Sequence, residues 1–392
     1  MSKRNVWALC LIFIFNPVIG LALSGLYGIN SRSKNHCIPF LILCSLYIAA
    51  INSTKIPESD ELAYIEMFAN VPRNGLWGTM QFLTDGVTTD IKEFLYGLLV
   101  YILYYLTFGH EFLFIAIISF LIYVIEFSAF YKICDSSISN FQLIAGICIL
   151  LFFPQFFNLS AQIIRQLLAT SIFLYALSVR EKSLKMFYVI SICSFFIHNS
   201  IGLILILSYI PFLHRRISIK IMAVLILIIL YIVTMIPEIA LSLLELNAFG
   251  GVNVALSKAS MGEEISDGGE VNMIIILIIT LPLLIISALD ALVKKNVMPS
   301  IITNLCMIWC LIVLSLSSMP VIQYRFFFVL YSFFPFILII PFQSRKRFSV
   351  ISCSFLSVFM LVMFCSSYNG GPYVYASWMK AVFYPYPFLL NY

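Results

Sequence analysis

EFLFIAIISFLIYVIEFSAFY, residues 111–131, is long and apolar enough to cross a lipid bilayer as one helix. Such a crossing needs roughly 17–25 residues, because each helical residue advances about 1.5 Å through a hydrocarbon core about 30 Å thick. The rest of the chain resembles this stretch: 62% of its 392 residues are hydrophobic, 10% are charged, and the mean hydropathy is +1.02. This composition argues against a soluble domain. The sequence therefore predicts an all-α polytopic integral membrane protein with a single domain over residues 1–392.

Similar apolar runs recur along the chain and predict about twelve transmembrane helices. Single spans are expected at 5–28, 38–51, 111–131, 139–157, 160–179, 220–236, 271–293, 298–318, 326–342 and 349–367. The run 184–213 is interrupted by His198 and has basic residues at both ends, which predicts two short helices that meet at His198. The run 94–108 is short and rich in tyrosine, which favours an interfacial or re-entrant helix.

The basic clusters predict the orientation of these helices. With the spans above, most clusters fall on one side, which is expected to be the cytoplasmic side. They are Arg32/Lys34, Lys132, Arg180/Lys182/Lys185, Arg215/Arg216/Lys220, Lys294/Lys295 and Arg345/Lys346/Arg347. Both termini are then external, although Lys3 and Arg4 favour the opposite orientation. Three external segments are expected: a loop with interfacial helices over 52–110, an acidic loop over 237–270 and an aromatic tail over 368–392.

Two arginines on the external side are candidates for binding a phosphorylated substrate. Arg165 and Gln166 open a predicted helix, and a helix N-terminus beside a guanidinium is a favourable site for a diphosphate. Arg325 opens another predicted helix in the same way, so the two arginines could share the oxygens of one diphosphate. The alternative is that each arginine only extends its side chain to the lipid head groups.

Three residues on the same side are candidates for a general base. Asp60 is favoured, because Tyr64 follows it by one helical turn and places a phenol on the same face as the carboxylate. Glu93 is the competing carboxylate, and His198 offers an imidazole that can accept a proton near neutral pH. The alternatives are a solvated loop charge for the carboxylates and a capping residue for the histidine.

Other classes of partner and cofactor are not expected. The acidic stretch GEEISDGGE, Gly262–Glu270, lacks the ordered ligand spacing of a calcium loop, so no metal and no other cofactor is predicted. The ten cysteines include no C-x-x-C pair, and neither a disulfide framework nor a cysteine-bound metal is expected. The net charge of +5 is scattered in small clusters, which argues against a nucleic-acid partner.

Four stretches carry a resemblance to a known family. They are SDELAYIEMF (Ser59–Phe68), KEFLYGLL (Lys92–Leu99), NLSAQIIRQLLATSIFLYAL (Asn158–Leu177) and KMFYVISICSFFIHNSIGLILIL (Lys185–Leu207). In order and spacing they resemble the EpsG/Wzy-type bacterial polysaccharide polymerases, which make O-antigen, capsule or exopolysaccharide. The resemblance covers roughly residues 50–210. The second half resembles the family only in hydropathy, the QYR motif that ends at Arg325 and the tyrosine-rich tail.

The resemblance implies a GT-C-like, multi-pass glycosyltransferase of the bacterial cytoplasmic membrane. Such an enzyme transfers a glycan from one undecaprenyl diphosphate carrier to the sugar of another, at the periplasmic or external face. A chain-length regulator and a flippase are candidate protein partners, beside the lipid bilayer and the lipid-linked glycans. The same residues would also suit a lipid-linked glycan ligase or another GT-C-like glycosyltransferase.

Two further classes remain as alternatives. A polysaccharide flippase or transporter would need a polar path through the middle of the membrane and would often show two repeated halves, and no internal repeat is found. A membrane O-acyltransferase would need an embedded histidine that faces a cytosolic acyl donor, whereas His198 is expected to face outward.

Overall fold

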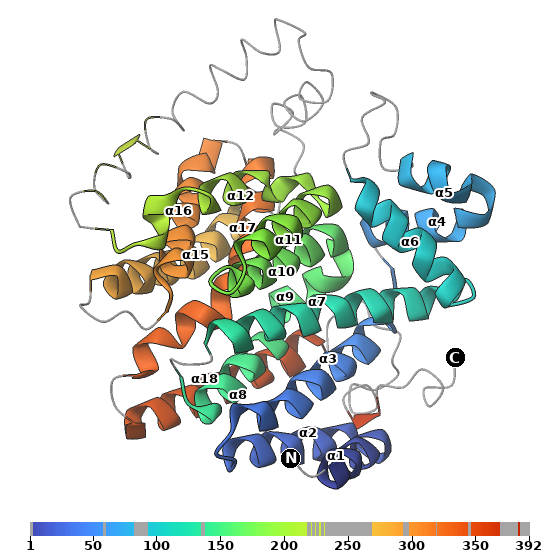
Figure 1. Cartoon of the computed structure of the whole chain (residues 1–392), viewed down its shortest axis with the longest axis horizontal. Coiled ribbons are helices and arrows are strands. Elements are labelled where there is room, and N and C mark those ends of the chain that lie inside the picture. Colours follow the sequence, from blue (N-terminus) through green and yellow to red (C-terminus); the bar gives the residue numbers. More distant parts are fainter. Residues whose placement is uncertain are drawn as a thin grey trace, which may run out of the picture. The chain divides into compact units, whose positions relative to one another are not determined.

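A computed structural model shows the chain as an assembly of helices (Figure 1). It describes residues 3–57, 60–81, 93–134, 138–217, 269–292, 298–318, 320–343 and 346–368, with single positions in 221–231 and the pair 383–384. Within these ranges every named element is an α-helix or a short 3-10 helix, which confirms the all-α prediction. The helices form two compact units.

The first unit comprises the described residues of 1–82, 93–198 and 341–392. Its helices are α1 (Lys3–Phe15), α2 (Pro17–Ile29), η1 (Lys34–Cys37), α3 (Ile38–Asn52), α4 (Asp60–Ala69), α5 (Val71–Gln81), α6 (Phe94–Leu106), α7 (Glu111–Ile133), α8 (Asn140–Leu151), α9 (Pro154–Gln162), α10 (Ile164–Val179), α11 (Leu184–Ile197) and α18 (Lys346–Tyr368). The long helix α7 packs against α3 and α10, and α10 packs in turn against α11. Buried side chains such as Phe114, Ile118 and Ile122 recur at a spacing of four on α7, which gives it an apolar face for these partners.

The second unit contains the described residues of 199–340. Its helices are η3 (Asn199–Ile201), α12 (Gly202–Ser208), η4 (Pro211–His214), α15 (Gly269–Leu292), α16 (Ser300–Ser315), η5 (Leu316–Ser318) and α17 (Pro320–Leu338). α16 packs against both α15 and α17. The buried amide of Asn304 donates hydrogen bonds to the carbonyls of Leu213 and Arg215 at 2.8 and 2.9 Å, and these bonds hold the η4 turn against α16.

Three helical segments in the described part of the chain are long and apolar enough to cross a membrane: Lys34–Asn52, Glu111–Ile133 and Met273–Ala291. A fourth is possible if the bent pair α8 and α9 counts as one span. The remaining apolar helices of this part are shorter, with 10–17 residues each. The long apolar helices indicate a membrane protein, while the expected total of about twelve crossings stays a prediction.

The expected span 5–28 is wrong, because the chain breaks into α1 and α2 at Asn16. The Asn16 side chain caps α2 by accepting a hydrogen bond from the Ile19 amide at 3.1 Å, and Pro17 begins that helix. A Cβ atom at Gly20 would lie 2.5 Å from the Cα of Phe13, so only a glycine lets α2 approach α1 this closely. The apolar run is therefore two short helices in close contact rather than one straight span.

The expected boundary between the spans 139–157 and 160–179 also differs. α8 ends at Leu151, and α9 begins at Pro154 with its axis bent by 58° from that of α8. A proline disfavours helical backbone in the residue before it, which accounts for the bend at Phe153. α9 is a separate short helix, and a second break at Ile163 separates it from α10.

Two other helix predictions are confirmed at the level of secondary structure. α6 has 13 residues, fewer than a crossing needs, as expected for the run 94–108. The run 184–213 breaks at His198, where α11 ends, and continues as η3 and α12. Nearly all of the expected acidic loop 237–270 and aromatic tail 368–392, and most of the expected span 220–236, lie outside the described residues.

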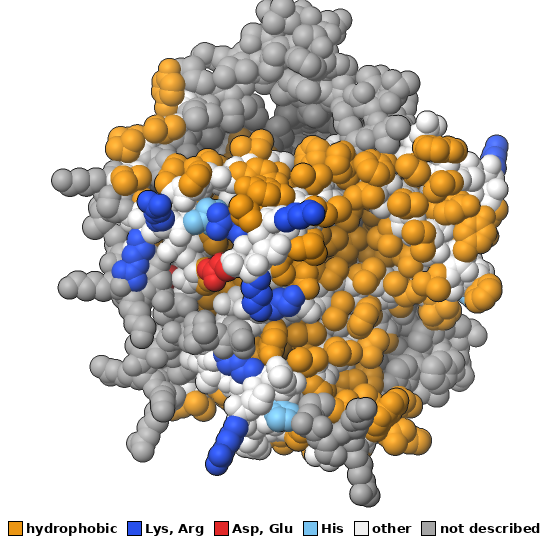
Figure 2. Space-filling view, in the orientation of Figure 1, with side chains coloured by type: hydrophobic (Ala, Val, Ile, Leu, Met, Phe, Trp, Pro, Cys, Tyr) orange, Lys and Arg blue, Asp and Glu red, His pale blue; other side chains and the backbone are white. Residues whose placement is uncertain are grey.

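Large hydrophobic side chains are exposed on several helices, and Figure 2 shows how much of the visible described surface is hydrophobic. On α11, Val189 and Ile192 are about half exposed, and on α18 Ile351 and Phe355 are about 70% exposed. Continuous apolar surface of this kind is costly in water and suits contact with lipid chains. The exposed faces thus support a membrane location for these helices.

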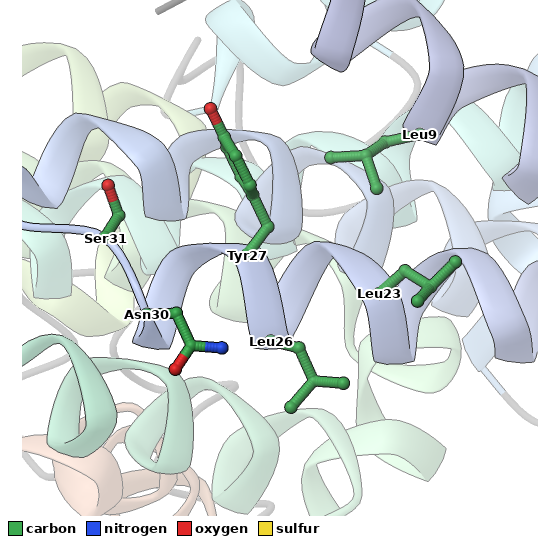
Figure 3. A pocket seen from close by; sticks show the side chains of 6 residues that line it. All are labelled: Leu9, Leu23, Leu26, Tyr27, Asn30 and Ser31. Carbon is green, nitrogen blue, oxygen red and sulfur yellow. The ribbon is translucent and has the colours of Figure 1, made fainter.

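The first unit has a pocket of about 490 Å³ beside α1 and α2 (Figure 3). Leu9 from α1 and Leu23 and Leu26 from α2 form its apolar walls. Tyr27, Asn30 and Ser31 line it near the end of α2. The pocket is thus mainly apolar, with polar groups at one end of the helix.

Candidate functional site

Arg165 lies in the first turn of α10, directly after the break in the helix. Ile163 has φ −113° and ψ 51°, outside the helical region, so α9 ends at Gln162 and α10 begins at Ile164. The sequence predicted that Arg165 opens a helix, and the structure confirms this position. A break of this kind leaves the first backbone N–H groups of α10 without partners within the helix, which creates a positive end beside the guanidinium.

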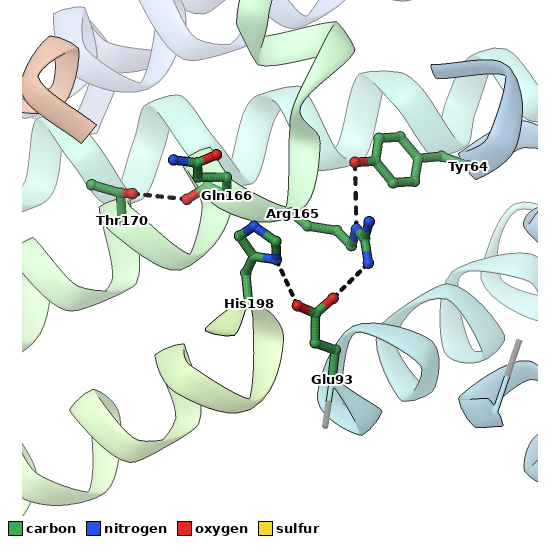
Figure 4. A network of polar contacts seen from close by, with 6 residues as sticks. All are labelled: Tyr64, Glu93, Arg165, Gln166, Thr170 and His198. Carbon is green, nitrogen blue, oxygen red and sulfur yellow. Dashed lines mark hydrogen bonds and ion pairs between the residues drawn. The ribbon is translucent and has the colours of Figure 1, made fainter. Parts of the chain in front are cut away.

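The carboxylate of Glu93 bridges two residues that are distant in sequence (Figure 4). Glu93 precedes α6, and its Oε2 atom accepts a hydrogen bond from Nη1 of Arg165 at 2.5 Å. Its Oε1 atom lies 2.7 Å from Nδ1 of His198. An ionised carboxylate only accepts hydrogen bonds, so Nδ1 is the donor. Arg165, Glu93 and His198 therefore form a continuous row of polar groups.

Tyr64 from α4 completes this row on the far side of Arg165. Nε of Arg165 contacts the Tyr64 hydroxyl at 3.4 Å, and the guanidinium carbon lies 5.3 Å from the centre of the Tyr64 ring. Burial raises the pKa of the Tyr64 phenol, and the charge of Arg165 offsets part of that rise. The phenol therefore stays protonated and can orient the guanidinium without carrying a charge of its own.

His198 lies where α11 ends and the chain turns away. Its backbone is extended, with φ −156° and ψ 126°, and its amide still donates to the Ser194 carbonyl at 3.1 Å. Glu93 holds Nδ1, and no hydrogen bond to Nε2 is found among the described residues. With the proton on Nδ1, the lone pair of Nε2 is available to accept another proton. The same carboxylate thus orients one cation and one potential base.

The four side chains are partly shielded from solvent but still reachable. Exposed fractions are 23% for Arg165, 17% for His198 and 11% for Glu93, while Tyr64 is buried. Nη1 and Nε of Arg165 are engaged by Glu93 and Tyr64, and among the described residues no hydrogen bond from its third nitrogen is found. The guanidinium therefore keeps N–H donors for an anionic group.

The remaining predicted site residues lie outside this row. Gln166 is buried next to Arg165, and its carbonyl accepts a hydrogen bond from Thr170 at 2.8 Å. Asp60 is exposed at the start of α4, one turn before Tyr64 as predicted, and its charge raises the pKa of Tyr64. Arg325 is exposed on α17 of the second unit, so its sharing of a diphosphate with Arg165 stays a prediction.

Sequence reasoning missed two contributors to the site. Lys55 and Glu61 form an ion pair at 3.4 Å with both side chains 1% exposed, and the pair holds the start of α4, the helix that carries Tyr64. Tyr96 on α6 is fully buried, with its ring centre 5.8 Å from that of Tyr64. In the sequence, Lys55 and Glu61 are only two opposite charges near one another, and Tyr96 is one of several tyrosines in its helix. Neither pattern reveals that these side chains are buried.

Comparison with known proteins identifies the family. No curated protein and no solved structure matches the chain. The sequence model of the EpsG family matches residues 35–386. This range is most of the chain and includes all four residues of the polar row. The chain therefore belongs to the EpsG family, the family of Wzy-type polysaccharide polymerases.

Proposed function

We propose that this protein joins undecaprenyl-diphosphate-linked oligosaccharide repeat units into a longer glycan at the external face of the bacterial cytoplasmic membrane. The observation that carries the proposal is the row Arg165–Glu93–His198, in which no hydrogen bond from the third nitrogen of Arg165 or to Nε2 of His198 is found within the described ranges. Family membership supports polysaccharide polymerisation in general. The lipid diphosphate donor and the GT-C-like fold are parts of the proposal.

Arg165 binds the diphosphate of the donor in this mechanism. Its free N–H groups and the N-terminus of α10 both favour an anion, and an arginine can hold two phosphate oxygens at once. Arg165 also stabilises the negative charge that develops on the diphosphate as it leaves. Gln166 and Tyr64 are proposed to complete the binding site around Arg165.

His198 acts as the general base, and Glu93 orients it. The acceptor sugar hydroxyl attacks the anomeric carbon of the donor, the bond from that carbon to the phosphate oxygen breaks, and undecaprenyl diphosphate leaves with the electron pair. Nε2 of His198 takes the hydroxyl proton, and the adjacent carboxylate of Glu93 stabilises the imidazolium. This geometry favours His198 over Asp60 as the base, because Asp60 is exposed and, among the described residues, no hydrogen bond or ion pair joins it to Arg165, Glu93 or His198.

The proposal is tested with the lipid-linked oligosaccharide that accumulates in a strain lacking this protein. When that lipid extract is added to membranes containing the protein, we expect a ladder of longer glycans and the release of undecaprenyl diphosphate. Membranes without the protein should produce neither. Transfer to a different acceptor in place of a ladder would favour the ligase alternative, and accumulation of unflipped lipid-linked oligosaccharide in the deletion strain would favour a flippase.

The proposed topology has about twelve spans and places the segment 52–110 on the external side of the membrane. It predicts which positions react with a reagent applied from outside. Single cysteines replacing Asp60 and His198 should react with a membrane-impermeant maleimide applied to intact cells. A cysteine replacing Glu181, which follows the opposite end of α10, should react only after the membrane is permeabilised. Labelling of the Asp60 and His198 positions from opposite sides would contradict a shared external site.

A further inference from the structure

Asn52 is a buried polar residue at the end of α3, where three helices meet. Its Nδ2 atom donates a hydrogen bond to Oγ of Ser160 on α9 at 2.7 Å and lies 3.4 Å from Oγ of Ser119 on α7. Ser160 in turn donates to the Phe157 carbonyl at 2.7 Å. The side chains of Asn52 and Ser160 are fully inaccessible, and that of Ser119 is nearly so. Because water does not reach them, the Nδ2 group of Asn52 relies on the two serine hydroxyls for its hydrogen bonds.

The hydrogen bond to Ser160 acts on the helix segment that precedes the site. Ser160 lies three residues before the break at Ile163, and Arg165 lies two residues after it. α9 has only nine residues, and an isolated helix of that length is not stable by itself. Its position therefore depends on its contacts with the neighbouring helices α3, α4, α7, α10 and α18. The Asn52–Ser160 hydrogen bond ties the last turn of α9 to the end of α3.

We propose that Asn52 is a positioning residue for Arg165. By holding the last turn of α9, it determines where the chain breaks and therefore where the guanidinium at the start of α10 lies. The inference deepens the proposed function and rests on the role of Arg165 as the diphosphate ligand. The hydrogen bonds found for Asn52 within the described ranges lead to Ser119 and Ser160 and not to the row, so Asn52 acts through the position of the helix.

The first test measures position without using the reaction. In a cysteine-free variant that retains activity, a single cysteine replaces Gln162, the half-buried last residue of α9. Adding Asn52→Leu, which is similar in shape but has no hydrogen-bond donor, should change the rate of thiol labelling at position 162 several-fold. Labelling of a cysteine at Ser178, near the other end of α10, should stay the same. An unchanged rate at position 162 would overturn the proposal.

The second test measures binding of undecaprenyl diphosphate to the purified protein. Asn52→Leu and the milder Ser160→Ala should each weaken binding about tenfold, because losing the bond lets the guanidinium shift from its productive position. Turnover at saturating donor should fall as well, because a displaced Arg165 also stabilises the departing diphosphate less well. Ser45→Ala is the matched control, since Ser45 is an equally buried serine on α3 whose hydroxyl, as far as the described residues go, bonds only to the Leu41 carbonyl of its own helix.

A double variant separates positioning from general loss of stability. In an Arg165→Ala background, Asn52→Leu should weaken binding no further, because the group that it positions is absent. Independent, additive losses would overturn the positioning role. By contrast, unchanged binding in Arg165→Ala alone would contradict the proposed function, whatever the labelling at position 162 shows.

Discussion

His198→Ala is expected to reduce glycan polymerisation by roughly 10²–10⁴-fold, the range typical for loss of a general base. The reason is that Nδ1 of His198 is held by Glu93, while no hydrogen bond to Nε2 is found in the part of the chain that the structure describes, so Nε2 can take the proton of the acceptor. Glu93→Gln should also cause a large loss, because an amide no longer presents an acceptor to both Arg165 and His198. The measurement is the initial rate of ladder formation in membranes supplied with the lipid-linked oligosaccharide.

Controls for this prediction come from residues of the same type outside the row. His110 and Glu111 are exposed around the start of α7, and His110→Ala and Glu111→Gln should keep normal rates. A Glu93→Gln/His198→Ala double variant should be about as slow as the slower single variant, since the two groups act as one unit. If Asp60→Asn abolishes polymerisation while His198→Ala does not, the base is Asp60 and the proposed role of His198 is wrong.

Arg165→Ala is expected to lower the polymerisation rate by about 10²–10³-fold while the protein still accumulates in membranes. Arg165→Lys should be nearly as impaired. Different nitrogens of the guanidinium contact Glu93 and Tyr64 at the same time and leave donors for the substrate, whereas a lysine has a single nitrogen. The rate is measured in membranes, and the amount of protein is measured in parallel to correct for expression.

Binding and turnover should fail together in these arginine variants. Arg165 binds the diphosphate of the donor and also stabilises its negative charge as it leaves. Binding of undecaprenyl diphosphate should therefore weaken together with the rate. His198→Ala should instead retain binding and make only single repeat units. Arg73→Lys, at an exposed arginine of α5, serves as the matched control and should be normal. Full activity in Arg165→Lys would mean that Arg165 is only a cation at the membrane surface.

Local signals in the sequence predicted much of the fold correctly. Long apolar runs give α3, α7 and α15, because an uninterrupted apolar stretch of this length is stable as a helix in lipid. The polar interruption at His198 marks the real end of α11. The break at Asn16 was missed although the Asn-Pro pair is a capping signal, since hydropathy alone does not distinguish one long helix from two short ones.

The sequence by itself determined the class of protein, the position of Arg165 at a helix start and the family resemblance, because each depends on residues that are close together in the chain. The tertiary structure alone decided which candidates act together. Glu93 is 72 residues from Arg165 and 105 residues from His198, and only the packing of α6, α10 and α11 brings the three side chains into contact. Asp60 was favoured as the base because Tyr64 follows it by one helical turn. Local spacing of this kind carries no information about which distant side chains contact Arg165 in the folded protein.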